Sequence, residues 1–163
     1  MSIGQSMIPE FDQEMATTRR VLERIPSDKG TWKPHEKSFS VGHLAQLVAR
    51  MPGWITMTVN HPKLDLSQGA AYSYETTETL LADFDRNVRE AREALASVTD
   101  EQMARPWSLT MGDKTLMSLP TGVVVRQNIN HLVHHRGQLT VYLRLLDIPV
   151  PSVYGPTADE HWS

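Results

Sequence analysis

Apolar residues recur every three to four positions along four long stretches of this chain, with polar residues between them. This is the period of an α-helix that buries one face. Pro26 ends the first stretch, and Ser40 is typical of the N-cap of the second. The pattern predicts helices over residues 8–25, 41–59, 77–98 and 121–146.

Residues 99–120 depart from this helical period. The run Thr99-Asp100-Glu101-Gln102 has the form of a capping box and predicts a short turn of helix. Residues 107–111 and 114–119 have the pattern of short strands, and Gly112-Asp113 between them favours a tight turn. We therefore expect a small hairpin before the last helix. The remaining segments are predicted to be irregular: 27–39, 60–73 and the extended tail 149–163.

Four amphipathic helices predict an all-α four-helix bundle with a hairpin-like insertion. The chain has 163 residues, of which 40% are hydrophobic and 21% charged, which indicates one globular domain spanning residues 1–163. No window reaches the roughly 18 apolar residues that span a bilayer, so we expect no membrane association. The first residues lack the pattern of a signal peptide, which predicts a cytoplasmic protein.

The charge and cysteine content exclude several kinds of site. The net charge is −3 and no long basic run occurs, which argues against nucleic-acid binding. The chain has no cysteine, which excludes disulfides, thiolate metal ligands and a cysteine nucleophile. Transition-metal ligands must then be histidine or carboxylate, which favours zinc, nickel, iron or manganese.

Three histidines lie close together in the last predicted helix: His131, His134 and His135. His131 and His135 are four positions apart, so on a helix both project from one face, one turn apart. That spacing lets two imidazoles reach one metal ion. His134 points about 100° away from His135 and is less suited to share the ion. Leu132 and Leu139 flank His135, which predicts that this imidazole points toward the packed side of the helix.

The neighbours of the histidines raise further expectations. Gly137 lies mid-helix, where it costs about 1 kcal/mol relative to alanine, so we expect a bulky group or another backbone close by. Arg136 and Gln138 have two interpretations: they orient a substrate or support the histidines, or they are a helix-end cation and an interface amide. The tryptophans line a pocket or belong to the core, and they are Trp32, Trp54, Trp107 and Trp162.

Several motifs follow one another in a fixed order over nearly the whole chain. They are Trp32-Lys33-Pro34, Ser38-Phe39-Ser40-Val41-Gly42, the run from His134 to Leu139 with Val141-Tyr142-Leu143-Arg144 after it, and the tail from Val150 to Gly155. In this order they resemble the DinB-like (DinB/YfiT) family. The resemblance implies a four-helix bundle, commonly a homodimer, with a divalent metal ion held by three histidines. One histidine comes from the second helix and two from the fourth.

Carried over to this chain, the two fourth-helix ligands fall on His131 and His135. Leu47 stands where the family usually has its second-helix histidine, and His43 lies one turn earlier on nearly the same face. Two alternatives stay open. Either His43 completes the site after a shift of about 6 Å along the helix axis, or the site is incomplete and holds no ion. Zinc or nickel is the expected metal if the site is complete, with iron or manganese next.

Three neutral imidazoles would leave a coordination position for water or substrate, as in catalytic metal sites. The resemblance implies thiol-dependent transferases, isomerases and metal-dependent hydrolases. The first functional hypothesis is therefore a metal-dependent thiol transferase or hydrolase acting on a small molecule or a low-molecular-weight thiol. The alternative is a non-catalytic dimeric bundle that has lost the third ligand at Leu47.

Overall fold

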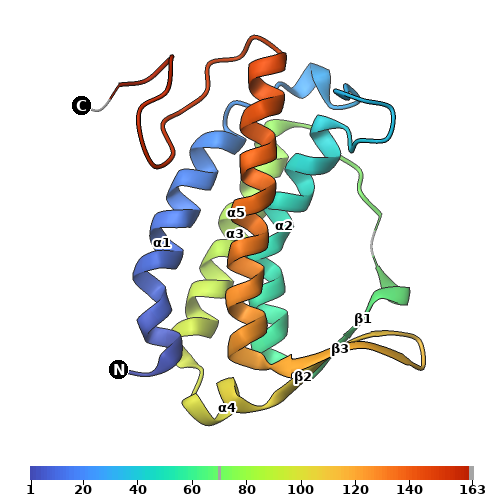
Figure 1. Cartoon of the computed structure of the whole chain (residues 1–163), viewed down its shortest axis with the longest axis vertical. Coiled ribbons are helices and arrows are strands. Elements are labelled where there is room, and N and C mark those ends of the chain that lie inside the picture. The colour runs from blue at the N-terminus through green and yellow to red at the C-terminus, as the bar shows by residue number, and fades with distance from the viewer. Residues whose placement is uncertain (70, 162–163) are drawn as a thin grey trace.

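The computed structural model describes residues 1–69 and 71–161, and its four long helices lie side by side (Figure 1). Both α1 and α2 pack against α3 and α5. This arrangement confirms the four predicted helices and the bundle they form. Their bounds are Ile3–Leu22 for α1, Val41–Asn60 for α2, Thr77–Ser97 for α3 and Thr121–Leu145 for α5.

The first helix begins five residues before its predicted start. Ser2 Oγ accepts a hydrogen bond from the Gln5 amide at 3.2 Å, and the Ser2 amide donates to Gln5 Oε1 at 3.2 Å. This capping box begins α1 at Ile3, and the helix continues through Pro9. The predicted start at residue 8 is wrong because the capping signal lies outside the apolar repeat.

The other predicted caps are confirmed. Ser40 Oγ accepts from the His43 amide at 3.2 Å and begins α2, which continues through Pro52. The Thr99 and Gln102 capping box forms as predicted and begins the short helix α4, Asp100–Ala104. These polar side chains satisfy amide groups that have no partner within the helix itself.

A small sheet accompanies the bundle, so the predicted all-α class is wrong in this respect. The predicted hairpin is confirmed as β2, Pro106–Met111, and β3, Lys114–Pro120. Gly112 has φ of 55° in its turn, a conformation that favours glycine. The strand β1, Lys63–Asp65, adds a parallel neighbour to β2, and it lies in a predicted loop. The predicted loops also contain two 3₁₀ helices, η1 at Ser27–Lys29 and η2 at Leu66–Gln68.

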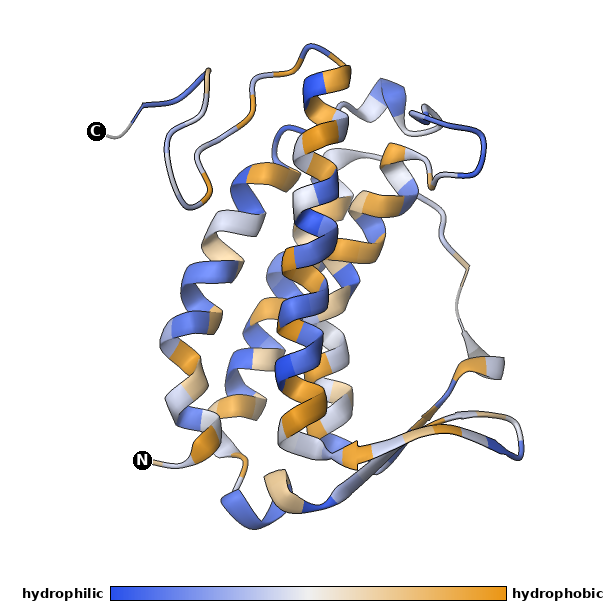
Figure 2. Ribbon diagram, in the orientation of Figure 1, coloured by the Kyte–Doolittle hydropathy of each residue, from blue (hydrophilic) through white to orange (hydrophobic). Residues whose placement is uncertain are grey.

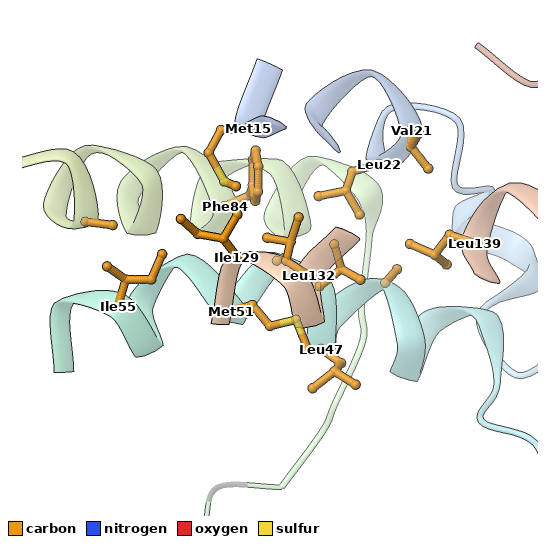
Figure 3. Close-up of a cluster of buried hydrophobic side chains, with 14 of the residues drawn as sticks. Met15, Val21, Leu22, Leu47, Met51, Ile55, Phe84, Ile129, Leu132 and Leu139 are labelled. Carbon is orange, nitrogen blue, oxygen red and sulfur yellow. The ribbon is translucent and has the colours of Figure 1, made fainter. Parts of the chain in front are cut away.

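The core lies between the four long helices. Figure 2 shows hydrophobic positions recurring along each helix between hydrophilic ones. Figure 3 shows Phe84 of α3, Ile129 and Leu132 of α5 and Met51 of α2 within one cluster. The largest fully buried apolar side chains are Phe11, Leu22, Leu44, Met51, Ile55, Phe84, Leu95, Ile129, Leu132, Leu139 and Leu143.

The C-terminal tail has no helix or strand up to residue 161 and folds back against the bundle. Asp159 accepts a hydrogen bond from the Val150 amide at 2.8 Å and pairs with Arg144 of α5. Glu160 pairs with Arg20 of α1. The predicted irregular tail is therefore confirmed, and its acidic residues hold it to two helices. In the described part of the chain, every helix is too short or too polar to cross a membrane.

Candidate functional site at the histidine pair of α5

His131 and His135 meet on one face of α5, as their spacing predicts. Their Nε2 atoms lie 2.9 Å apart, and their ring centroids lie 4.7 Å apart. At this distance one ring donates a hydrogen bond to the other. One of the two Nε2 atoms therefore carries a proton, and the other accepts with its lone pair.

Gln138 fixes which nitrogen carries the proton. His135 Nδ1 lies 2.7 Å from Gln138 Oε1, and Gln138 Nε2 lies 3.3 Å from His134 Nε2. An amide oxygen can only accept, so His135 Nδ1 carries a hydrogen and its Nε2 accepts from His131. The sequence left two interpretations for Gln138, and the structure favours the supporting role.

The surroundings of His131 favour its neutral form. Partial burial lowers the pKa of His131, and the neighbouring His135 and His134 lower it further. The ring of Trp54 from α2 lies 5.9 Å from the His131 ring, centroid to centroid. A neutral imidazole can accept or donate a proton, or provide a lone pair to a cation.

His43 does not join this pair. Its ring stacks between Phe39 and Tyr72, with centroid distances of 4.3 Å and 4.2 Å. Burial lowers the pKa of His43, and the charge of Arg50 lowers it further. Within residues 1–69 and 71–161, no three histidine, aspartate or glutamate side chains are grouped so that they could hold a metal ion.

A pocket of about 390 Å³ lies beside His131, between the bundle and the small sheet. Its walls include Trp54 and Met57 of α2, Trp107 and Leu109 of β2, and Val124 of α5. The described residues that line it include no aspartate, glutamate, lysine or arginine. Pockets of this size and apolar character are typical small-molecule sites.

The model of the DinB family matches residues 1–162 of this chain. The chain belongs to the DinB family. It is similar to the uncharacterized protein YrdA of Bacillus subtilis (strain 168), with 25% identity over 168 residues, 96% of this chain and 90% of YrdA.

Two crystal structures of DinB-like proteins share the fold. The protein from Bacillus cereus ATCC 10987 has a TM-score of 0.72 at 18% identity, and the alignment covers 92% of this chain and 97% of that one. The protein YjoA from Bacillus subtilis has a TM-score of 0.71 at 19% identity, with 96% and 99% covered. At these identities the likeness establishes the DinB-like fold alone.

The residues of this DinB-family chain do not fit a three-histidine ion. His131 and His135 supply two converging nitrogens, which need to separate only to about 3.4 Å to occupy two corners of a tetrahedral zinc site. Leu47 supplies no donor atom and is 7% exposed within the core cluster. Figure 3 shows it beside Met51, and it follows His43 by four residues in α2. Neither candidate for the third ligand reaches the pair.

The other expectations around the pair have mixed outcomes. The chain itself provides no close neighbour for Gly137, because an added Cβ would meet nothing of it within 4 Å. Trp54 and Trp107 line the pocket, whereas Trp32 packs edge-on against Tyr142 with centroids 5.7 Å apart. The predicted role of Trp162 falls outside the described residues.

Arg136 is the residue whose position the sequence did not indicate. It is 1% exposed and lies inside α5, so it is not a helix-end cation. Its Nη1 donates to the Glu14 carbonyl and to Thr18 Oγ1, each at 3.1 Å. Its Nη2 donates to Tyr154 Oη at 2.9 Å. Arg136 therefore joins α5 to α1 and to the tail.

Proposed function

We propose that this chain is a DinB-family bundle that binds a small molecule at the His131–His135 pair, without the three-histidine ion that the family resemblance implies. One observation carries the proposal. The two α5 histidines meet at 2.9 Å, while His43 is stacked between two other rings and Leu47 has no ligand atom. This favours the second of the two sequence hypotheses, a bundle that has lost the third ligand.

The neighbourhood of the pair supports small-molecule binding. Gln138 holds His135 in one tautomer, and burial favours the neutral form of His131. A neutral His131 at the wall of an apolar pocket can hydrogen-bond a polar group on a bound molecule. A low-molecular-weight thiol or another small organic molecule fits this description.

A divalent-metal enzyme, either a thiol transferase or a hydrolase, is the second candidate. It is favoured by the convergence of the two Nε2 atoms and by the bond from His135 Nδ1 to Gln138, an arrangement common for metal-binding histidines. Zinc or nickel would be the expected ion, and iron or manganese the next. With only two protein ligands, the affinity would be low.

Zinc and nickel titration of the purified, tag-free chain separates the two candidates. We expect the wild type to bind zinc weakly, and His131→Ala to remove that binding. We expect Leu47→His to bind zinc at least tenfold more tightly, because it adds a third imidazole on the turn of α2 that the family uses. The double variant Leu47→His/His131→Ala is the matched control and should lose this gain.

Elemental analysis of the purified chain measures the result that would contradict the proposal. Near one tightly held ion per wild-type chain, lost in His131→Ala, would overturn the proposal and establish the metal enzyme instead. A Leu47→His variant that binds no tighter than the wild type would contradict the assignment of Leu47 to the missing ligand position.

We also propose that the chain forms a homodimer through one face of α5. Residues 123, 127, 130, 134, 137 and 141 are exposed and uncharged, and they follow a spacing of alternating four and three. Val123 and Val141 are 44% and 57% exposed. This spacing is the repeat by which two helices pack together, and the open space at Gly137 leaves room for a close approach.

A further inference from the structure

We propose that the pocket beside His131 takes a neutral, apolar molecule and excludes charged ones. The inference rests on the proposed function, since it names the class of molecule that His131 would meet.

The walls define what enters the pocket. Tryptophan, methionine, leucine and valine side chains supply most of the lining, and the described lining residues carry no formal charge. A carboxylate, phosphate or ammonium group placed here would lose its hydration without gaining a counter-ion. A flat or branched apolar group would instead replace water against Trp54 and Trp107.

The polar side chains of the pocket are partly paired with one another. Thr58 Oγ1 donates to the Trp54 carbonyl at 2.7 Å, and Asn128 Nδ2 donates to Thr58 Oγ1 at 3.2 Å. These bonds hold α2 and α5 together along one wall. They leave Thr58 already engaged as both donor and acceptor.

Trp107 supplies an apolar wall and not a donor. Trp107 is 3% exposed, and its Nε1 atom is buried away from any water-sized group and has no hydrogen-bond partner among the described residues. The ring carbons of this side chain are therefore what the pocket offers to a bound molecule on β2.

The test uses prodan, a neutral naphthyl ketone whose fluorescence shifts to the blue in apolar surroundings. A naphthalene carboxylate, which has the same ring system and a negative charge, is the matched probe. We expect saturable prodan binding to the full wild-type chain, and at least tenfold weaker binding of the carboxylate. Met117→Trp, which places a large ring at the half-buried edge of the pocket, should abolish prodan binding.

Circular dichroism melting curves check that the Met117→Trp chain folds. Binding of the carboxylate as tight as that of prodan would overturn the neutral class of molecule. Absence of prodan binding to the wild type, or undiminished binding to a folded Met117→Trp chain, would overturn the pocket assignment.

The two proposals can fail separately. The zinc titrations report on the histidine pair, and the prodan titrations report on the pocket. A chain that binds prodan as expected and also holds a tight ion at His131 would overturn the proposed function and leave this inference standing. A chain with weak zinc binding and no prodan binding would do the reverse.

Discussion

Arg136 of α5 and Glu14 of α1 form a buried ion pair, with Nη1 2.6 Å from Oε2 and side-chain exposures of 2% and 11%. The other carboxylate oxygen, Oε1, accepts from the Tyr154 hydroxyl at 2.8 Å. Two helices and the tail thus meet at one charged centre. A buried pair of this kind adds little net stability when intact, but the loss of one partner leaves a charge without compensation.

Arg136→Ala should therefore destabilise the chain by about 3–5 kcal/mol in urea unfolding. The matched control is Arg126→Ala, which breaks the exposed pair with Glu10 between the same two helices and should cost under about 1 kcal/mol. The double variant Arg136→Met/Glu14→Leu should recover most of the loss. Equal costs for Arg136→Ala and Arg126→Ala would contradict the buried-pair interpretation.

Much of this fold could be predicted from the sequence because its signals are local. The Thr99 to Gln102 capping box and the Gly112-Asp113 turn each act over four residues or fewer, and both form as predicted. The strand β1 was missed because three residues cannot display a period, and its partner β2 lies far along the chain. A parallel pairing of that kind depends on tertiary structure.

The candidate site was predictable to the same extent. The i, i+4 spacing of His131 and His135 fixes their meeting on any helix, and it was confirmed. The environment of His43 was not predictable, because it depends on Phe39 and Tyr72 from two separate loops. Gly137 was expected to have a close neighbour, and the chain itself provides none. A glycine within a helix leaves room for a close approach, but the sequence does not tell whether the approaching group belongs to the same chain or to a second one.

The bond between His135 and Gln138 leads to a spectroscopic prediction. Because Gln138 Oε1 accepts from His135 Nδ1, His135 should be in the Nδ1–H tautomer near neutral pH. Long-range ¹⁵N–¹H NMR correlations of the imidazole rings distinguish the two tautomers. Gln138→Leu removes the acceptor and should convert His135 to a mixture. An unchanged tautomer in Gln138→Leu, or an Nε2–H tautomer in the wild type, would refute the proposed chain of hydrogen bonds.

The stacked ring of His43 leads to a prediction about pH. Burial and the charge of Arg50 lower the pKa of His43, whereas a histidine in the unfolded chain titrates near its usual value of about 6.5. As the pH falls, the unfolded chain binds the proton first, so the stability present above about pH 6.5 is lost as the pH falls toward the lower folded pKa. Tyr72, the other ring beside Arg50, stays neutral through this range because burial raises its pKa.

We therefore expect acidification from about pH 7.5 to about pH 5.5 to reduce the unfolding free energy of the wild type more than that of His43→Phe. Phenylalanine keeps a ring between Phe39 and Tyr72 and removes the titrating group. Urea unfolding at each pH measures the difference. The same pH dependence in both chains would show that another group carries the effect.

The exposed face of α5 leads to the last prediction. Val141→Arg places a charge on the uncharged face that runs from Val123 to Val141, so two copies of this face would bring like charges together in a desolvated contact. We expect analytical ultracentrifugation to show a dimer for the wild type and a monomer for Val141→Arg, with unchanged helix content. Leu116→Arg is the matched control, because Leu116 is 45% exposed on the hairpin and lies outside this face. If Leu116→Arg alone dissociates the dimer, then the hairpin forms the interface, and the repeat on α5 needs another partner.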